Sequence, residues 1–114
     1  PWKEFGKIVA LTDEETGIEY TLEFNRESVM FAEARGFKIS DVADYPMSKI
    51  PELWFYAFRM HHRNVARAKT DALLDGLGGI PAGLMERLGE LYAAPFSALT
   101  DGQTDENPRV TVKL

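Results

Sequence analysis

Two stretches near the N-terminus have the pattern of β-strands. Between Ile18 and Phe24, apolar side chains alternate with polar ones, and a second apolar stretch runs from Phe5 to Ala10. An apolar residue at every second position places those side chains on one face, as in a half-buried strand. The residues between the two stretches are polar and end in Gly17, which is typical of a hairpin loop. The pattern therefore predicts an N-terminal β-hairpin.

A helix is expected directly after the second strand. Asn25 can accept a hydrogen bond from a free N–H group of a first helical turn, and Gly36 can adopt the left-handed conformation that ends a helix. These two signals predict a helix from about Arg26 to Arg35. The connector that follows, Phe37 to Tyr45, has room for one helical turn at residues 41–44.

The most apolar segment of the chain runs from Glu52 to Met60, where seven of nine residues are apolar or aromatic. A helix that is apolar on nearly all sides is buried on nearly all sides, so we expect this one to lie at the centre of the core. Ser48 is its expected N-cap, and Pro51 is tolerated in a first turn, where N–H groups have no intrahelical acceptor. The helix should continue to about His62 or Asn64.

Two further helices are expected in the second half of the chain. The first runs from about Arg67 to Leu77, with leucines on its inner side and glycines after it. The second begins at Pro81, a favourable first helical residue, and ends at Ala94-Pro95. Its apolar residues follow the spacing of an amphipathic helix: Leu84, Met85, Leu88, Leu91 and Tyr92.

A short final strand is expected at the C-terminus, because Val110 and Val112 alternate with Thr111 and Lys113. A two-stranded ribbon is only marginally stable in water, so this strand should join the N-terminal hairpin. The predicted fold class is α+β: a small antiparallel sheet, made of the N-terminal hairpin plus the C-terminal strand, with about four helices packed on one face. A length of 114 residues fits one domain, residues 1–114.

Composition narrows the functional classes. The apolar fraction of 45% is sufficient for a packed core, and the absence of cysteine excludes disulfides and cysteine-based zinc sites. No apolar run approaches the roughly 20 residues of a membrane span. The net charge of −5 disfavours a general nucleic-acid-binding protein. Residues 59–69 nevertheless hold four basic residues and no acidic one.

The candidates for catalytic chemistry are weak. His61 and His62 are adjacent, and adjacent helical positions point about 100° apart, so the two rings do not converge on one tetrahedral metal site. Packing or capping at a helix end is the simpler interpretation. The glycine-rich stretch from Gly76 to Pro81 lacks the phosphate-binding motifs and follows a helix rather than a strand. The sequence therefore predicts no catalytic, cofactor or metal site.

Candidate partner-binding residues come from charge and aromatic content. Three arginines recur at four-residue intervals from Arg59, which would place them on one face of a continuous helix. They can form a solvated face paired with local acids, or a docking patch for an acidic surface such as that of a second copy of the chain. The aromatic helix can be core, or be covered in part by a partner. The candidates are Trp54, Phe58, Arg59, Arg63, Arg67, Leu88, Leu91 and Tyr92.

The order of these pieces resembles a known family over almost the whole chain. The pieces are LEFNRESV (residues 22–29), a Gly-Phe turn, PxxxIPELWFYAFRMHH (residues 46–62), Lys-Thr-Asp at residues 69–71, and a strand after Asn107-Pro108. Their order and spacing are similar to those of the tail assembly chaperones of siphophages and prophages of Gram-positive bacteria. These motifs serve packing and capping, and none of them is a catalytic signature.

The resemblance implies a binding protein rather than an enzyme. Members of this family are thought to bind the tape measure protein and keep it soluble, in the host bacterial cytoplasm, until tail tube subunits polymerise around it. A longer, frameshifted version commonly recruits the tail tube protein. We also expect a homo-oligomer, without nucleic acid or membrane partners. The alternatives are a structural phage tail or head-tail connector component, an enzyme, and a small DNA-binding regulator.

Overall fold

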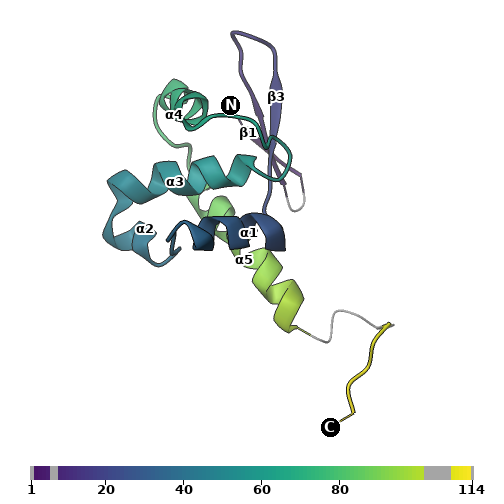
Figure 1. Cartoon of the computed structure of the whole chain (residues 1–114). Helices are drawn as coiled ribbons and strands as arrows, with labels where there is room; N and C mark the ends of the chain where they lie inside the picture. The colour runs from purple at the N-terminus through teal and green to yellow at the C-terminus, as the bar shows by residue number, and fades with distance from the viewer. Residues whose placement is uncertain (1, 6–7, 102–108, 114) are drawn as a thin grey trace.

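The computed structural model describes residues 2–5, 8–101 and 109–113, with no side-chain description for residues 2–5. It has the predicted α+β class (Figure 1). The strands are β1 (Trp2–Phe5), β2 (Ile8–Thr12) and β3 (Glu19–Leu22). The helices are α1 (Arg26–Ala34), α2 (Asp41–Asp44), α3 (Pro46–Phe58), α4 (Arg67–Gly76) and α5 (Leu84–Thr100).

The sheet has three antiparallel strands in the order β1-β2-β3. The predicted hairpin is confirmed as β2 and β3, in which Val9 pairs with Leu22 and Leu11 pairs with Tyr20. All four side chains are buried, so one face of the hairpin joins the core. The predicted strand from Phe5 to Ala10 is in fact divided, because Phe5 ends β1 and Ile8 opposite it begins β2.

The predicted C-terminal strand is wrong for the described residues 109–113, which have no regular structure. The third strand of the sheet is β1 instead. Val110 and Val112 are 82% and 78% exposed. The outer edge of β3 is closed by the chain after α3, because the Thr21 N–H donates to His62 Nε2 at 2.8 Å. With β1 on the edge of β2 as well, the hairpin has no free edge for another strand.

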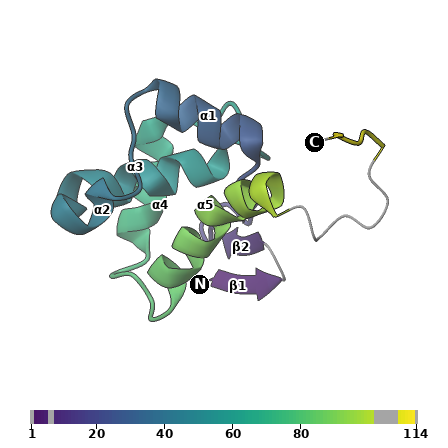
Figure 2. The same ribbon diagram turned by 90° about the horizontal axis from the view of Figure 1, so that it is seen from below.

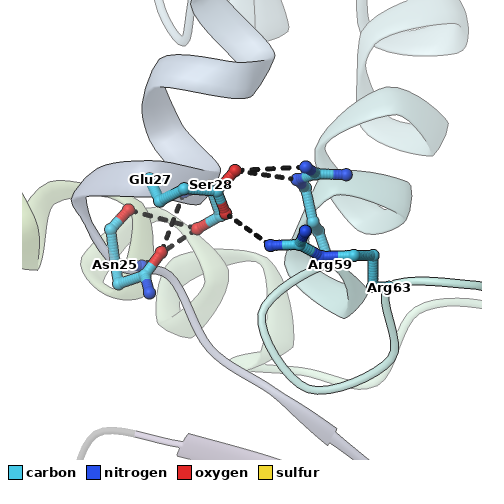
Figure 3. Close-up of polar contacts among 5 residues, drawn as sticks. All are labelled: Asn25, Glu27, Ser28, Arg59 and Arg63. Carbon is cyan, nitrogen blue, oxygen red and sulfur yellow. Dashed lines mark hydrogen bonds and ion pairs between the residues drawn. The ribbon is translucent and has the colours of Figure 1, made fainter.

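The cap of α1 forms as predicted (Figure 3). The Ser28 N–H donates to Asn25 Oδ1 at 2.8 Å, and the Asn25 N–H donates to Ser28 Oγ at 2.9 Å. This reciprocal pair satisfies two backbone donors at the start of the helix. Gly36, with a φ of +86°, follows the helix in the left-handed conformation that its sequence position indicated.

The central helix α3 differs from prediction at both ends. It begins at Pro46, and the Ser48 hydroxyl donates to the Tyr45 carbonyl at 3.3 Å instead of capping the helix. Proline at the first position has the right φ and lacks only an N–H group that would have no partner. The helix ends at Phe58 rather than near His62, because the chain turns there to bring His62 against β3.

Aromatic packing joins α3 to its neighbours. The rings of Trp54 and Phe58 meet edge to face with centroids 5.3 Å apart, and Phe58 packs in the same way against Tyr20 of β3 at 5.5 Å. Trp54 Nε1 donates to the carbonyl oxygen of Thr70 in α4 at 2.7 Å. Trp54 and Phe58 are each 1% exposed. These two buried side chains therefore join α3 to the sheet on one side and to α4 on the other.

Helix α5 begins at Leu84 and runs to Thr100, so the predicted end at Ala94-Pro95 is wrong. Proline inside a helix removes its own N–H and strains the preceding turn, but it leaves the later donors free. Helical bonding resumes after Pro95, and the Asp101 N–H reaches the Ser97 carbonyl at 2.9 Å. The predicted inner residues Leu84, Leu88 and Leu91 are buried.

Replacing Phe58 by alanine should lower the free energy of unfolding by about 3–5 kcal/mol, because it removes a buried aromatic ring from this shared contact. Urea unfolding followed by circular dichroism measures the change. Met47, which is 90% exposed, provides the matched control, and Met47→Ala should leave the midpoint nearly unchanged. Equal midpoints for the Phe58→Ala variant and the parent chain would contradict the assignment of α3 as the core helix.

Stability should also fall at mildly acidic pH. Burial, and secondarily the charge of His61, lowers the pKa of His62 below its ordinary value of 6.5. Only the neutral ring can accept the hydrogen bond from the Thr21 N–H. Because the unfolded chain then binds the proton more tightly, the stabilisation is complete above about pH 6.5 and is lost as the pH falls towards the lower folded-state pKa.

The measurement is the free energy of unfolding between about pH 7 and pH 5, compared with that of His62→Gln. Glutamine keeps an acceptor but does not titrate, so the variant should lose this part of the pH dependence. Identical pH profiles for the two proteins would show that His62 does not couple the sheet edge to pH.

Candidate functional site

An open groove of about 470 Å³ lies between α1 and α5, and we call it the α1–α5 groove. Both helices pass close together in the two ribbon views (Figures 1 and 2). Most of the lining is apolar. The lining residues are Arg26, Val29, Met30, Glu33, Ile39, Gly89, Tyr92, Ala93, Pro95, Phe96 and Leu99.

Helical periodicity places these side chains on facing walls. The α1 wall is formed by residues 26, 29, 30 and 33, the spacing of a single helical face. The α5 wall follows the same rule at residues 89, 92, 93, 96 and 99. The groove is therefore a seam between two helix faces, and it runs along both helices.

Tyr92 forms the floor of the groove. Its ring packs edge to face against Phe24 at 5.0 Å and against Phe37 at 5.6 Å between centroids, and it is 9% exposed. Burial, followed by the negative charge of Glu33, raises the pKa of the Tyr92 hydroxyl above its ordinary value. The phenol therefore stays neutral at physiological pH and gives the groove a rigid, uncharged base.

The upper walls of the groove expose large apolar side chains to solvent. Met30 and Leu99 are each 58% exposed, Phe96 is 68% exposed, and Ile39 is 40% exposed. Exposed apolar residues that stand singly are common, but a contiguous set around a concave surface marks a binding site. This concentration identifies the groove as the candidate functional site.

Gly89 gives the groove part of its depth. A Cβ atom at this position would meet no other heavy atom within 4 Å, so the absence of a side chain leaves open space. Glycine inside a helix costs about 0.5–1 kcal/mol relative to alanine. Gly89 therefore makes α5 less stable, at a position where a larger side chain would fill the groove.

Two charged residues, Arg26 and Glu33, stand at opposite ends of the α1 wall. Seven residues of helix separate them, which corresponds to roughly 10 Å along the axis. Neither residue forms an ion pair within the part of the chain that the structure describes. The apolar groove thus has a positive end and a negative end.

The structure places four of the predicted partner-binding residues in the core. Trp54, Phe58, Leu88 and Leu91 are only 1–2% exposed and belong to the core, so their side chains are not accessible to a partner. A periodic apolar pattern does not distinguish a face buried inside a domain from one covered by another molecule. Tyr92 is the one predicted apolar residue that lines the groove.

The basic segment 59–69 is largely paired with acidic side chains within the chain. Arg59 Nη2 lies 3.1 Å from Glu27 Oε2, and Arg63 Nη2 lies 3.7 Å from Glu27 Oε1 (Figure 3). Arg67 pairs with Asp71 at 2.9 Å, and Lys69 pairs with Asp13 at 3.0 Å. Because Arg59 and Arg63 share one carboxylate, three acids pair with four cations, and the segment offers little unpaired charge for the predicted docking patch.

Arg59 has a structural role in this network. Its guanidinium carbon lies 3.6 Å from the centroid of the Phe31 ring in α1. Together with the Glu27 ion pair, this contact fixes α1 against the end of α3. Both interactions are partly exposed and contribute modestly, about 0–1 kcal/mol each. They also hold one wall of the α1–α5 groove in place.

The two histidines lie at the edge of the sheet. His61 Nε2 is 2.8 Å from Glu23 Oε1, and His62 Nε2 accepts the Thr21 N–H. In the described residues, no group of three or more histidine, cysteine, aspartate or glutamate side chains lies close enough to hold a metal ion. The glycine-rich stretch connects α4 to α5, with Gly78 and Gly79 at positive φ.

A second cavity of about 420 Å³ lies between the hairpin loop and α4. The Lys69–Asp13 pair lies in its lining, and the hydrogen bond from Lys69 lowers the pKa of the Asp13 carboxyl. Lys69 and Asp13 therefore satisfy one another, while Glu14 and Glu15 add negative charge to the lining.

Among the described helices, none is long and apolar enough to cross a membrane.

Sequence reasoning missed most of the groove. The signal was present in α5, where Phe96 and Leu99 continue the spacing of the buried residues Leu88 and Tyr92. The interpretation of Pro95 as a helix end hid this continuation. The facing residues of α1 could not be assigned to the same site, because no local pattern shows which two helices meet.

Gly89→Ala should raise the free energy of unfolding by about 0.5–1 kcal/mol, because alanine is the better helix former and its Cβ meets no other atom. Thermal and urea unfolding measure the effect. Gly36→Ala is the opposite control, since Gly36 has a φ of +86° that strains any other residue. A destabilised Gly89→Ala variant would contradict the open space at this position.

Comparison with known proteins gives one positive result. No curated protein and no solved structure matches the chain. A family model described as Domain of unknown function (DUF5055) matches residues 5–114. Because the match extends over nearly the whole sequence, the chain belongs to the DUF5055 family.

Proposed function

We propose that this protein is a phage tail assembly chaperone that binds helical segments of the tape measure protein and keeps that protein soluble while the tail tube assembles. The observation that carries the proposal is the apolar α1–α5 groove, with its exposed Met30, Phe96 and Leu99. The resemblance of the sequence to tail assembly chaperones supplies the identity of the client. In this role the protein acts in the host bacterial cytoplasm as a binding protein without catalytic activity.

The shape of the groove suits an amphipathic helix. Such helices insert side chains at positions i, i+3, i+4 and i+7 into apolar grooves between helices. The walls here have the same periodicity, so a client helix can lie along the seam and cover the exposed apolar residues. A long helical protein that exposes such faces would otherwise aggregate, and covering them keeps it in solution.

The two charged ends favour one direction of the client. Arg26 attracts an acidic residue and Glu33 attracts a basic one, at a separation of about two helical turns. A client helix with acidic and basic residues at that spacing would bind in one orientation and resist the reverse. Such contacts at the edge of an interface contribute to specificity more than to affinity.

A single groove should bind weakly. Full burial of a large apolar side chain contributes about 1.5–3 kcal/mol, but the four exposed residues of the groove are already partly buried, and association costs about 4–15 kcal/mol in lost freedom of motion. A long client with many similar segments compensates, because neighbouring copies of the chaperone bind at high effective concentration when they also contact one another. The proposal therefore includes a homo-oligomer, and a frameshifted longer form as the link to the tail tube protein.

The test is co-expression of the tape measure protein from the same genome with the parent chain or with groove variants. Gly89→Leu should fill the groove and reduce the soluble fraction of the tape measure protein several-fold. Gly89→Ala is the matched control and should preserve solubility, because its small side chain leaves most of the groove open.

Circular dichroism and the thermal midpoint verify that Gly89→Leu remains folded. Full chaperone activity in folded Gly89→Leu would exclude the groove as the client site. Recovery of the protein as a stoichiometric part of finished tails would favour the alternative of a structural tail component.

A further inference from the structure

We propose that residues 109–113 of one copy pair with β1 of a second copy and extend its sheet by a fourth strand. This inference does not depend on the groove or on its client. It rests on two features of the same chain: a segment with strand character and a sheet edge, neither of which has a strand partner among the described residues. The occupant of the edge is a second copy of this protein.

The C-terminal segment has the composition of a strand but is solvent-exposed. Val110, Thr111 and Val112 are three consecutive β-branched residues, which favour extended pairing. The two valines are 82% and 78% exposed, so the segment makes little contact with its own domain. Alternation places both valines on one face. Once the segment is paired, they would contact the side chains of the neighbouring strand on that face.

The sheet offers one edge for such pairing. On the β3 side, the Thr21 N–H is bound by His62, and the Glu23 N–H donates to the Ala57 carbonyl at 3.1 Å. On the other side, β1 (Trp2–Phe5) is the last strand of the order, and among the described residues no strand lies beyond it. An unpaired strand edge presents a row of N–H and C=O groups that a strand from another chain can bind.

The course of α5 favours pairing between copies over pairing within one chain. The helix has 17 residues and spans about 25 Å. It carries the chain away from the sheet, and residues 109–113 lie apart from the sheet in both ribbon views (Figures 1 and 2). To return along the whole of α5, a connection of seven residues would have to be almost fully extended, because seven residues reach at most about 25 Å, whereas a neighbouring copy can present its edge directly.

The proposed contact is heterologous, because each copy contributes a strand at one place and an edge at another. Repetition of such a contact generates a ring or an open filament. Its energy comes from backbone hydrogen bonds and from burial of the two valines, so association should depend little on salt. This property distinguishes it from association through the charged segment 59–69.

The first test is sedimentation velocity of the full chain over a range of concentrations, with Thr111→Pro and Val112→Pro. In a strand, consecutive N–H groups point to opposite sides, so only one of the two prolines removes a donor that faces β1. One variant should weaken self-association by about tenfold or more, and the other much less. Thr111→Ala and Val112→Ala retain both N–H groups and are the matched controls, which measure the loss of each side chain alone.

The second test uses the absence of cysteine in the natural sequence. Copies with Lys3→Cys are mixed with copies that carry Thr111→Cys, and the mixture is oxidised mildly. A disulfide-linked heterodimer should exceed both homodimers, and the disruptive proline should abolish it. The chain that carries both cysteines should form linked dimers and larger species rather than a cross-linked monomer.

Several outcomes would overturn the proposal. A monomer at every concentration excludes it, and a double-cysteine chain that links only within itself shows pairing inside one copy. Equal effects of the two prolines contradict a hydrogen-bonded strand. Loss of association in Gly89→Leu but not in the proline variants would place the second copy in the α1–α5 groove instead, whereas failure of client binding alone would leave this inference intact.

Discussion

The structure depends on the need to cover α3 on nearly every side. A chain of 114 residues has a small interior, and this helix presents aromatic side chains around most of its circumference. The sheet covers one side through Tyr20, α4 covers another through the hydrogen bond from Trp54, and α1 and α5 cover the rest. The other elements are arranged according to which side of α3 they protect from water.

The same constraint explains where apolar surface remains exposed. The first half of α5 places Leu84, Leu88 and Leu91 in the core, but the helix continues past the end of the domain interior. Its later turns keep the apolar periodicity although no core remains for them to join. Phe96 and Leu99 therefore face solvent beside α1, and the groove is a continuation of the core beyond the edge of the fold.

Elements that are fixed by contacts between sequence neighbours could be predicted from the sequence, whereas those fixed by contacts between distant residues could not. The cap at Asn25 and the hairpin loop at Gly17 depend on neighbouring residues, and both were predicted from local pattern. The end of α5 was misjudged because tertiary contacts and later hydrogen bonds outweigh the cost of Pro95. The exclusion of residues 109–113 from the sheet and the pairing of α1 with α5 depend on distant parts of the chain, which periodicity does not encode.

Pro95 also affects how the groove responds to what it holds. Because proline has no N–H to donate to the Leu91 carbonyl, the last turns of α5 are joined to the rest of the helix by one fewer hydrogen bond. A helix bends most easily at a proline, so we expect the segment that carries Phe96 and Leu99 to tilt more readily than the turns packed in the core. In the proposed role, such tilting would let the groove adjust its width to helices with different side chains. The proposed chaperone would gain breadth of recognition from this arrangement at the expense of affinity for any one segment.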